Sequence, residues 1–344
     1  MMSFLENILN NQKKNKIRIA TVVQGDKIGQ KAFFYNGVVE GTDVEDIFHK
    51  LAKEDNAIIQ EEQPVIVEKN GQKIFIESLQ KEPHMVICGG GHVSIPVIQM
   101  AKMLEFHVTV LEDRPLFADN ARRAGADEVI CNSFVQGLQQ IEGNENTYFV
   151  IVTRGHRYDV DCLTEILQKD HAYIGMIGSK KRVKSVKELM EEKGFSRELI
   201  DSIYSPIGLK IGAETPAEIA VSIMAEIIQV KNTKKGNIGY TKEILQFLEE
   251  WKENQVPVAV VTIISRKGSA PRGIGTKMIV TRDGRMIGTI GGGCAESAIQ
   301  GQAIQCMEKG ESKLVFVDMT GKEAEEDGMV CGGVIEVFID CCRL

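Results

Sequence analysis

A regular alternation of short apolar segments with helical stretches fills residues 84–231 and restricts the fold more than any other feature of the chain. It begins with His84–Cys88 (HMVIC), followed by Gly89-Gly90-Gly91 and a helical stretch. Parallel strands require crossover connections, which are usually helices. The alternation therefore predicts an α/β domain with a parallel, Rossmann-like sheet and helices on both faces.

The glycine run after the first strand matches the G-x-G-x-x-G/A fingerprint of dinucleotide-binding folds, with Ser94 at the last position. An acidic pair ends the second strand about 20 residues later, where such folds place the carboxylate that binds ribose. The pattern predicts a bound nucleotide or phosphate, and the alternative is a Rossmann domain that serves only as a scaffold. The residues assigned to this site are Gly89, Gly90, Gly91, His92, Glu112, Asp113 and Arg114.

Two further loops follow the fourth and fifth predicted strands, at the edge where open α/β sheets bind ligands. In the first loop, His156 and Asp159 either orient one another or hold a phosphate together with Arg154; a loop histidine satisfied by its neighbours is the alternative. The second loop places three cations near a helix start, where the helix dipole does not favour them. This favours an anion site over a solvated basic helix face. The residues assigned to the two loops are Thr153, Arg154, His156, Asp159, Gly178, Ser179 and Lys180.

The segments on either side of this domain are small α+β units with the same order of elements. Residues 1–80 contain a helical start, the strand IRIATVV, and Asn-Gly turns at Asn36 and Asn70, which are strong hairpin signals. Residues 241–344 contain a helix, the strand VPVAVVTIIS, a glycine-rich stretch, a second helix and two closing strands. We therefore expect three domains, 1–80, 81–232 and 241–344, the first a degenerate repeat of the third. A shared strand order would support this hypothesis.

The glycine-rich stretch from Lys267 to Glu296 contains no aromatic residue, so it exposes main chain rather than large side chains. Glycines let another molecule approach the main chain, and successive N–H groups can form a concavity that binds anions. Cys294 follows three glycines at a predicted helix start, a position that depresses the pKa of a thiol. Cys331 also lies beside glycines, so the two sulfurs could hold a soft, sulfur-rich ligand. The alternatives are hairpin turns with buried thiols, or a redox pair.

Composition and charge exclude several classes of function. The net charge of −7 argues against a nucleic-acid-binding surface, which needs a concentrated basic face. The chain has no apolar run long enough to span a membrane, and its first residues lack a signal-peptide pattern. None of the eight cysteines forms a C-x-x-C pair, so the sequence predicts no structural metal site. We expect a cytoplasmic protein with reduced thiols and neither nucleic acid nor membrane as a partner.

Several of these motifs together resemble one family, the XdhC/CoxI accessory proteins of xanthine dehydrogenase and related molybdenum hydroxylases. Three segments resemble the family's glycine and cysteine signature: GSAPRG at 268–273, GTIGGGCAE at 288–296 and MVCGG at 329–333. Its Rossmann-type domain is resembled by ICGGGHVS, LEDRP, TRGHRYD, IGMIGSKKR and ETPAEIAVSIMAEI. In the usual family order the glycine and cysteine unit comes first, whereas here the complete unit is last and a reduced copy stands first.

The resemblance implies a chaperone, rather than an enzyme, that binds molybdenum cofactor (molybdopterin) transiently and delivers it to an apo-hydroxylase. It also implies a role in exchanging an oxo ligand of the cofactor for a sulfido ligand, together with a cysteine desulfurase. We further expect a homodimer. By the matching motifs, Cys294 is the leading cofactor contact and Cys331 the second. The resemblance assigns binding of the pterin phosphate to Ser269, Arg272 and the backbone of Gly291, Gly292 and Gly293. The assigned site also includes Glu296, Gly332 and Gly333.

Two other functions stay open on the sequence. One is an oxidoreductase that uses a nucleotide such as NAD(P) in the Rossmann site, with His156 as the candidate proton donor. The other is a passive scaffold that bridges a cysteine desulfurase and the hydroxylase. Turnover of nicotinamide by the purified protein would favour the oxidoreductase.

Overall fold

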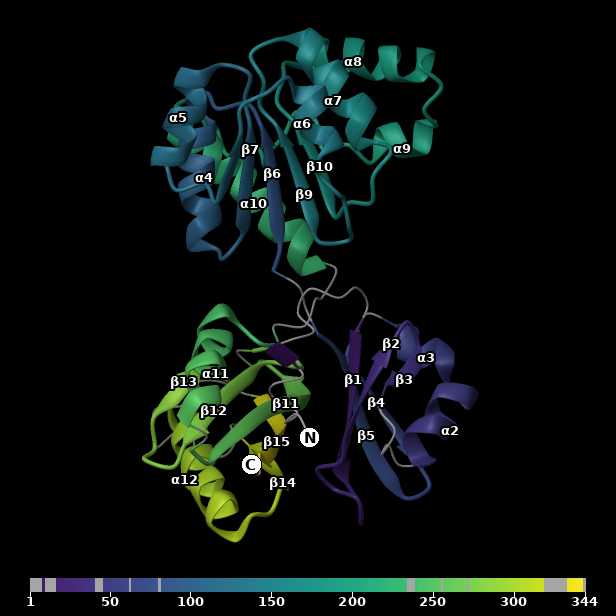
Figure 1. Cartoon of the computed structure of the whole chain (residues 1–344), viewed down its shortest axis with the longest axis vertical. Coiled ribbons are helices and arrows are strands. Elements are labelled where there is room, and N and C mark those ends of the chain that lie inside the picture. The colour runs from purple at the N-terminus through teal and green to yellow at the C-terminus, as the bar shows by residue number, and fades with distance from the viewer. Residues whose placement is uncertain are drawn as a thin grey trace. The chain divides into compact units, whose positions relative to one another are not determined.

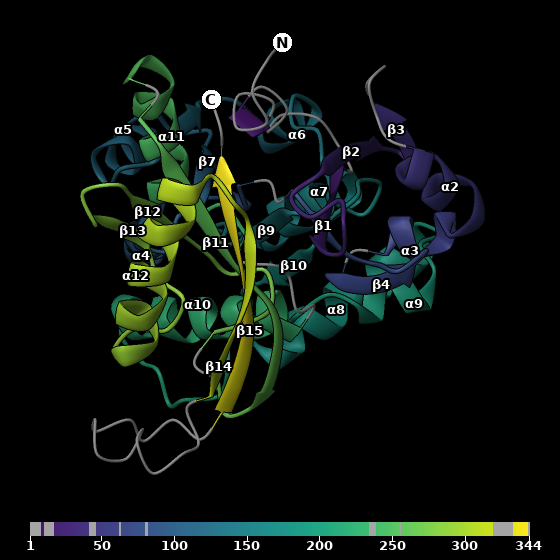
Figure 2. The ribbon, with the colours of Figure 1, turned by 90° about the horizontal axis from the view of Figure 1, so that it is seen from below.

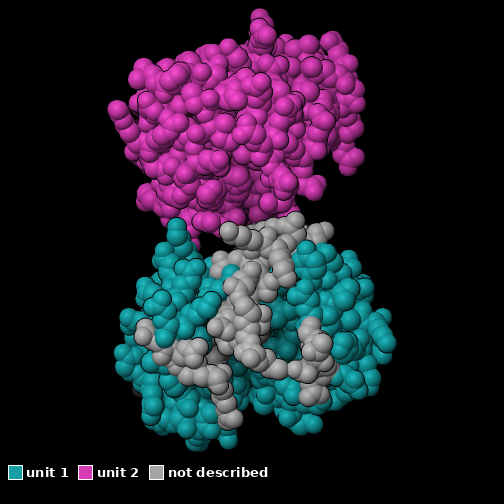
Figure 3. All heavy atoms as spheres, viewed as in Figure 1, with its two compact units in different colours: residues 1–80, 236–344 teal, residues 81–235 magenta. Residues whose placement is uncertain are grey.

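The computed structural model describes residues 8–9, 17–40, 46–61, 63–79, 82–233, 239–254, 256–270, 272–318 and 333–342. The chain forms two compact units, coloured separately in Figure 3. The terminal unit combines Met1–Gln80 with Gly236–Leu344, and the Rossmann unit is Lys81–Lys235. The segments expected as the first and third domains thus share one compact unit. None of the helices in the described ranges is long and apolar enough to cross a membrane.

The Rossmann unit is built on a parallel five-stranded sheet in the order β10-β9-β6-β7-β8 (Figure 1). Helices α4, α5 and α10 cover one face of the sheet, and α6 to α9 cover the other. This is the predicted Rossmann-like arrangement. The strands are β6 His84–Cys88, β7 His107–Leu111, β8 Glu128–Ile130, β9 Thr147–Ile151 and β10 Tyr173–Met176. The helices are α4 Ser94–Met103, α5 Pro115–Arg123, α6 Phe134–Gln139, α7 His156–Ile166, α8 Lys180–Glu192, α9 Arg197–Asp201 and α10 Pro216–Thr233.

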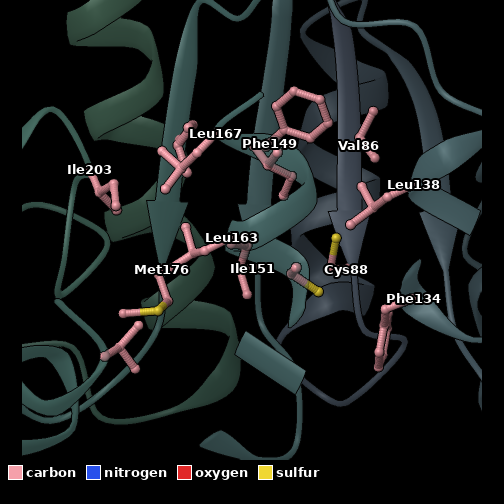
Figure 4. Packing of buried hydrophobic residues seen from close by; sticks show 14 of the residues in the cluster. Val86, Cys88, Phe134, Leu138, Phe149, Ile151, Leu163, Leu167, Met176 and Ile203 are labelled. Carbon is pink, nitrogen blue, oxygen red and sulfur yellow. The ribbon is translucent and has the colours of Figure 1, made fainter. Parts of the chain in front are cut away.

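The strands of this sheet are apolar on both faces because helices bury both. Successive strand residues point to opposite faces, so Val86 and Cys88 join the core under α6 to α9, while Met85 and Ile87 join the core under α4 and α10. Figure 4 shows the first of these cores, with Phe134 and other helical side chains packed against the strands. Such two-sided burial explains why these segments read as continuous apolar runs.

Side chains and a proline mark the start of helix α10. The hydroxyl of Thr215 accepts a 3.3 Å hydrogen bond from the N–H of Glu218, and the Glu218 carboxylate accepts a 3.0 Å bond from the N–H of Thr215. This is a capping box, with Pro216 at the first helical position. Local chemistry therefore sets this boundary.

The terminal unit contains two antiparallel sheets with the same topology. Their orders are β3-β2-β1-β5-β4 and β13-β12-β11-β15-β14, so each strand of the first sheet has a counterpart in the second. The predicted fold class is confirmed, and the shared strand order is the outcome that the repeat hypothesis requires. The first sheet comprises β1 Ile17–Gln24, β2 Lys31–Tyr35, β3 Val38–Glu40, β4 Val65–Lys69 and β5 Gln72–Ser78. The second comprises β11 Val258–Gly268, β12 Lys277–Thr281, β13 Met286–Gly288, β14 Lys313–Asp318 and β15 Gly333–Cys342.

Helices pack against both sheets of the terminal unit. Helices α2 (Asp46–Glu54) and α3 (Asn56–Gln60) connect β3 to β4, and α12 (Cys294–Lys309) connects β13 to β14. Helix α12 packs over the face of β11 that carries Ala259, Val261 and Ile263, as Figure 2 shows from below. Helix α11 (Lys242–Asn254) packs against Val258 and Val260 on the opposite face.

Candidate functional site

Three segments with predicted ligand-binding residues adjoin strands of the C-terminal sheet, and two of them lie side by side. Strands β11 and β13 both pair antiparallel with β12, so they run in the same direction; β13 ends at Gly288, level with Val261, and β11 continues to Gly268. Strand β15 pairs antiparallel with β11, so it begins there, with Gly333 opposite Gly268. We give the residues that end or follow β11, follow β13 and begin β15 the name glycine edge, defined as residues 268–270, 272–273, 289–296 and 333.

Close backbone packing joins two of these segments. A Cβ atom on Gly333 would lie 2.8 Å from the backbone nitrogen of Ala270 and 2.9 Å from the carbonyl carbon of Ser269, which is too close for any side chain. Glycine is therefore needed at position 333 for β15 to start beside the loop after β11. The predicted site residues Ser269 and Gly333 lie together as a result. Cys331 and Gly332, assigned with them, lie outside the described residues.

The loop after β11 presents its polar side chains outward. Ser269 and Arg272 are exposed. The guanidinium of Arg266 donates 3.3 Å hydrogen bonds to the carbonyls of Ala270 and Arg272, and the Thr276 hydroxyl donates a 2.8 Å bond to the carbonyl of Gly273. These contacts hold the loop backbone while leaving a hydroxyl and a guanidinium at the surface. An exposed guanidinium suits recognition of a phosphate.

The glycine turn before α12 wraps around the carboxylate of Glu296. Oε1 of Glu296 accepts hydrogen bonds from the N–H of Ile290 at 3.0 Å, the N–H of Gly292 at 2.9 Å and the hydroxyl of Thr289 at 2.6 Å. The carboxylate therefore takes the place that an external anion would have in such a concavity. The sequence motif includes Glu296 in the site but does not predict this role. The available signal was a glutamate at the third position of a helix, where it can reach back to N–H groups.

Left-handed backbone makes glycine necessary in this turn. Gly291, Gly292 and Gly293 have φ values of 136°, 78° and 67°, a region that other residues rarely adopt. A Cβ atom on Gly292 or Gly293 would meet no other atom within 4 Å, so the turn is open on its outer side. Gly293 caps α12 and Cys294 is its first residue; the side chain of Cys294 lies outside the described part. The positive end of the helix dipole lies at this position.

The carboxyl edge of the Rossmann sheet holds the other predicted residues, and there an internal network occupies the key carboxylate. Glu112 is fully buried. It accepts a 2.7 Å hydrogen bond from the N–H of Gly90, and Arg114 donates a 2.8 Å bond to it from Nε. The residue expected to bind ribose thus binds the glycine loop of its own domain.

The glycines of that loop are explained by packing within the domain. A Cβ on Gly89 would lie 2.6 Å from the carbonyl oxygen of Val152, and one on Gly90 would lie 2.8 Å from that of Phe117. A Cβ on Gly91 would meet no atom within 4 Å, and His92 is exposed. The first two glycines therefore serve the approach of the loop to neighbouring strands and helices.

A second ion pair lies beside the first. Arg154 binds Asp113 through both guanidinium nitrogens, at 2.5 Å and 2.8 Å, and stacks over the ring of Tyr158 at 4.3 Å. The hydrogen bonds from Arg154 lower the pKa of Asp113 to about 2. The sequence predicts that Asp113 and Arg154 contact a ligand at this edge. In the structure they form an ion pair with each other.

Asp159 is buried and accepts a 2.6 Å bond from the Thr153 hydroxyl and a 2.7 Å bond from Nε of Arg182. Burial raises the pKa of Asp159, and these two bonds oppose that shift. In the described part of the chain Asp159 thus bonds Thr153 and Arg182 rather than His156, which begins α7. Arg182 is one of the three cations that the sequence predicts as anion partners near the start of α8, and its pairing with Asp159 was not predicted.

The last predicted loop leads into α8. Ser179 caps this helix, since its hydroxyl accepts a 3.3 Å bond from the N–H of Arg182, and it follows Gly178. Lys180 is exposed at the first position of α8. Three cations at this edge, Arg114, Arg154 and Arg182, are thus paired with the three carboxylates Glu112, Asp113 and Asp159.

Comparisons with known proteins agree with both parts of the chain. Residues 85–227 match the XdhC Rossmann domain, and residues 251–318 match the XdhC and CoxI family. The protein named "Uncharacterized protein YqeB" from Escherichia coli (strain K12) is 30% identical over 171 residues, which are 48% of this chain and 30% of that protein.

Two other relatives have more informative names. One, from Bacillus subtilis (strain 168), is named as a probable subunit of xanthine dehydrogenase and is 30% identical over 158 residues, or 46% of each chain. "Molybdenum cofactor insertion chaperone PaoD" from Escherichia coli (strain K12) is 33% identical over 102 residues, 30% of this chain and 32% of that protein. The chain thus spans less than half the length of these relatives. With an XdhC Rossmann domain and an XdhC and CoxI domain in one chain, the protein belongs to the XdhC and CoxI family.

Proposed function

We propose that this chain is an accessory protein of a molybdenum hydroxylase, which binds molybdenum cofactor at the glycine edge and passes it to the apo-enzyme. The observation that carries the proposal is the packing of Gly333 against the loop of Ser269 and Arg272, on the sheet whose strand β13 leads into the turn before Cys294. These segments are distant in sequence, and each had been assigned to the cofactor by its motif.

The chemistry of this edge suits the two ends of the cargo. The cofactor carries a phosphate and a dithiolene, so it needs an anion contact and a place for soft sulfur. The exposed side chains of Ser269 and Arg272 supply the first, and Cys294 at the helix start is our candidate for the second. Because Glu296 already binds the N–H of Gly292, we assign the phosphate to Ser269 and Arg272 rather than to that part of the backbone.

The wider role follows from the same proposal. The client is a xanthine dehydrogenase-type hydroxylase, and a cysteine desulfurase supplies sulfur for the sulfido ligand of the cofactor. The names of two relatives support the client and the cargo, since one refers to xanthine dehydrogenase and the other to a cofactor insertion chaperone. The reaction itself belongs to the hydroxylase, so we assign the chain a carrier role.

The geometry of the Rossmann edge weighs against the oxidoreductase. A nicotinamide-dependent enzyme would need the carboxylate after β7 to bind ribose, and Glu112 is buried against Gly90 and Arg114. We therefore favour the carrier over the oxidoreductase for this chain.

The proposal is tested by incubating the purified chain anaerobically with molybdenum cofactor and measuring pterin retained after gel filtration. We expect Arg272→Ala to lose most of the bound cofactor, because the phosphate contact is gone. The matched control is Arg282→Ala, an exposed arginine on the turn after β12. Equal retention by both variants would remove Arg272 from the site. A wild-type chain that binds a desulfurase but no cofactor would favour the scaffold.

A further inference from the structure

The two sheets of the terminal unit correspond residue by residue. Thr21 in β1 pairs with Lys31 and Phe75, and Thr262 in β11 pairs with Lys277 and Phe338. Lys31 therefore corresponds to Lys277, and Phe75 corresponds to Phe338. Two positions earlier, Ile19 pairs with Glu77 and Val260 pairs with Asp340, which makes those two carboxylates equivalent.

The same irregularity interrupts both central strands. The register shifts between Val22 and Gln24 in β1 and between Ile263 and Ser265 in β11, so Val23 corresponds to Ile264. A β-bulge redirects side chains, and these two residues pack together with Phe75 and Phe338 in one buried cluster. Each sheet thus contributes an equivalent pair of apolar residues to a shared core.

Two ion pairs cross between the sheets, and they exchange equivalent partners. Nζ of Lys277 lies 2.6 Å from Oε1 of Glu77, and Nζ of Lys31 lies 2.6 Å from Oδ2 of Asp340. The lysine of each half therefore binds the carboxylate of the other half. A third pair, Lys73 with Glu336 at 3.4 Å, joins two positions that also correspond. Reciprocal contacts of this kind define an isologous interface between two copies related by a twofold axis.

The halves differ at the edge that carries the glycine motif. In the C-terminal half, β14 and β15 are connected through residues 319–332, whereas in the N-terminal half Asn70 and Gly71 suffice to connect β4 and β5. At the equivalent edge of the N-terminal sheet, the side chains of Asp26 and Gln72 hydrogen-bond each other. The interface is therefore kept in both halves, while the glycine edge is present in one.

We propose that residues 17–79 act as a built-in second copy of the C-terminal half. They occupy, within one chain, the face that the C-terminal sheet would otherwise offer to a second copy of itself. The chain is a pseudo-dimer with one glycine edge, and its own N-terminal half replaces the homodimer partner at this face. The inference rests on the strand registers and ion pairs of the terminal unit and is independent of the cofactor.

The test uses charge exchange in the full chain, with thermal unfolding as the readout. Lys277→Glu and Glu77→Lys each place two like charges in a buried site, so each should lower Tm by at least about 5 °C. The chain with both substitutions should recover at least half of that loss. The two single variants, unfolded and refolded together as a mixture, should show no recovery, because each chain pairs its own halves.

Two results would overturn the proposal. Recovery in the co-refolded mixture would mean that the halves pair between chains, and no recovery in the doubly substituted chain would mean that Glu77 and Lys277 do not face each other. If the single variants fail to fold, the equivalent pair supplies milder ones. Lys31→Gln and Asp340→Asn remove one charge each, and the same three comparisons of Tm apply to them.

Discussion

The carboxylate of Glu296, in the first turn of α12, accepts a 2.9 Å hydrogen bond from the backbone N–H of Gly292. The same oxygen binds the N–H of Ile290 and the hydroxyl of Thr289, so one side chain fixes the turn that precedes Cys294. An internal anion thus organises the backbone on which the proposed cofactor site depends.

Replacing Glu296 should loosen this turn. Glu296→Ala leaves three donors without their acceptor, and we expect the free energy of unfolding to fall by about 1–3 kcal/mol. Glu296→Gln keeps one carbonyl oxygen and should cost less. Urea denaturation measures both, with Glu308→Ala, an exposed glutamate on the same helix, as the control. A Glu296→Ala chain as stable as the Glu308→Ala chain would contradict the assignment.

Glycine substitutions should separate backbone strain from helix propensity. Gly293 has a φ of 67° and open space around its Cβ direction, so Gly293→Ala should cost about 1–2 kcal/mol from strain alone. Gly301 lies inside α12 with equally open space, and Gly301→Ala should stabilise the chain by about 0.5–1 kcal/mol. Chemical denaturation of the two variants gives the comparison. A Gly293→Ala chain at least as stable as the wild type would show that the turn does not require glycine.

Acid should weaken the Rossmann unit through His84. Burial, and then the nearby His107, lower the pKa of His84 from 6.5 to about 4, and its Nε2 lies 2.9 Å from the Thr109 hydroxyl oxygen. The pKa of His84 is lower in the folded chain than in the unfolded chain. The stabilisation from neutral His84 is therefore fully present above the unfolded-state pKa and is lost as the pH falls toward the folded-state pKa. Between about pH 7.5 and about pH 5 the loss should be roughly 2 kcal/mol.

The measurement is the pH dependence of urea unfolding in three chains. His84→Gln should lack this part of the slope, whereas His49→Gln, at an exposed histidine in α2, should keep it. An unchanged slope in His84→Gln would assign the acid sensitivity to other groups.

Two neighbouring carboxylates should differ in their contribution to stability. Glu112→Ala strands the buried N–H of Gly90 and the guanidinium of Arg114, and we expect a loss of about 2–4 kcal/mol. Asp113→Ala breaks a more exposed pair with Arg154 and should cost less than about 1 kcal/mol. Denaturation monitored by circular dichroism can rank them. The reverse order would argue that Glu112 is held for a ligand rather than for the fold.

The features that the sequence predicted well depend on local chemistry. The Asn36-Gly37 and Asn70-Gly71 turns adopt the positive φ values that their hairpins need. The alternation of strands and helices sufficed for the parallel sheet, because each strand is apolar on both faces. The motif at 288–296 likewise marked a real glycine turn at a helix start.

The features that sequence analysis missed depend on contacts between distant residues. The position of Glu112 in the motif predicts a ribose ligand. The motif does not reveal that Glu112 binds the N–H of Gly90, 22 residues away in sequence. Lys277 and Glu77 are separated by 200 residues, and only the packing of two sheets brings them together. The internal repeat hinted at that packing, but an ion pair exchanged between the halves appears only when both registers are known.

Binding of molybdenum cofactor through Cys294 at the glycine edge can be measured by an anaerobic binding titration. The wild-type chain, Cys294→Ala and Cys131→Ala are compared, the last being an exposed cysteine of the Rossmann unit. We predict that Cys131→Ala binds as the wild type does and that Cys294→Ala binds at least about tenfold more weakly, a difference of about 1.4 kcal/mol. Equal affinity of the Cys294→Ala and Cys131→Ala chains would contradict binding through Cys294.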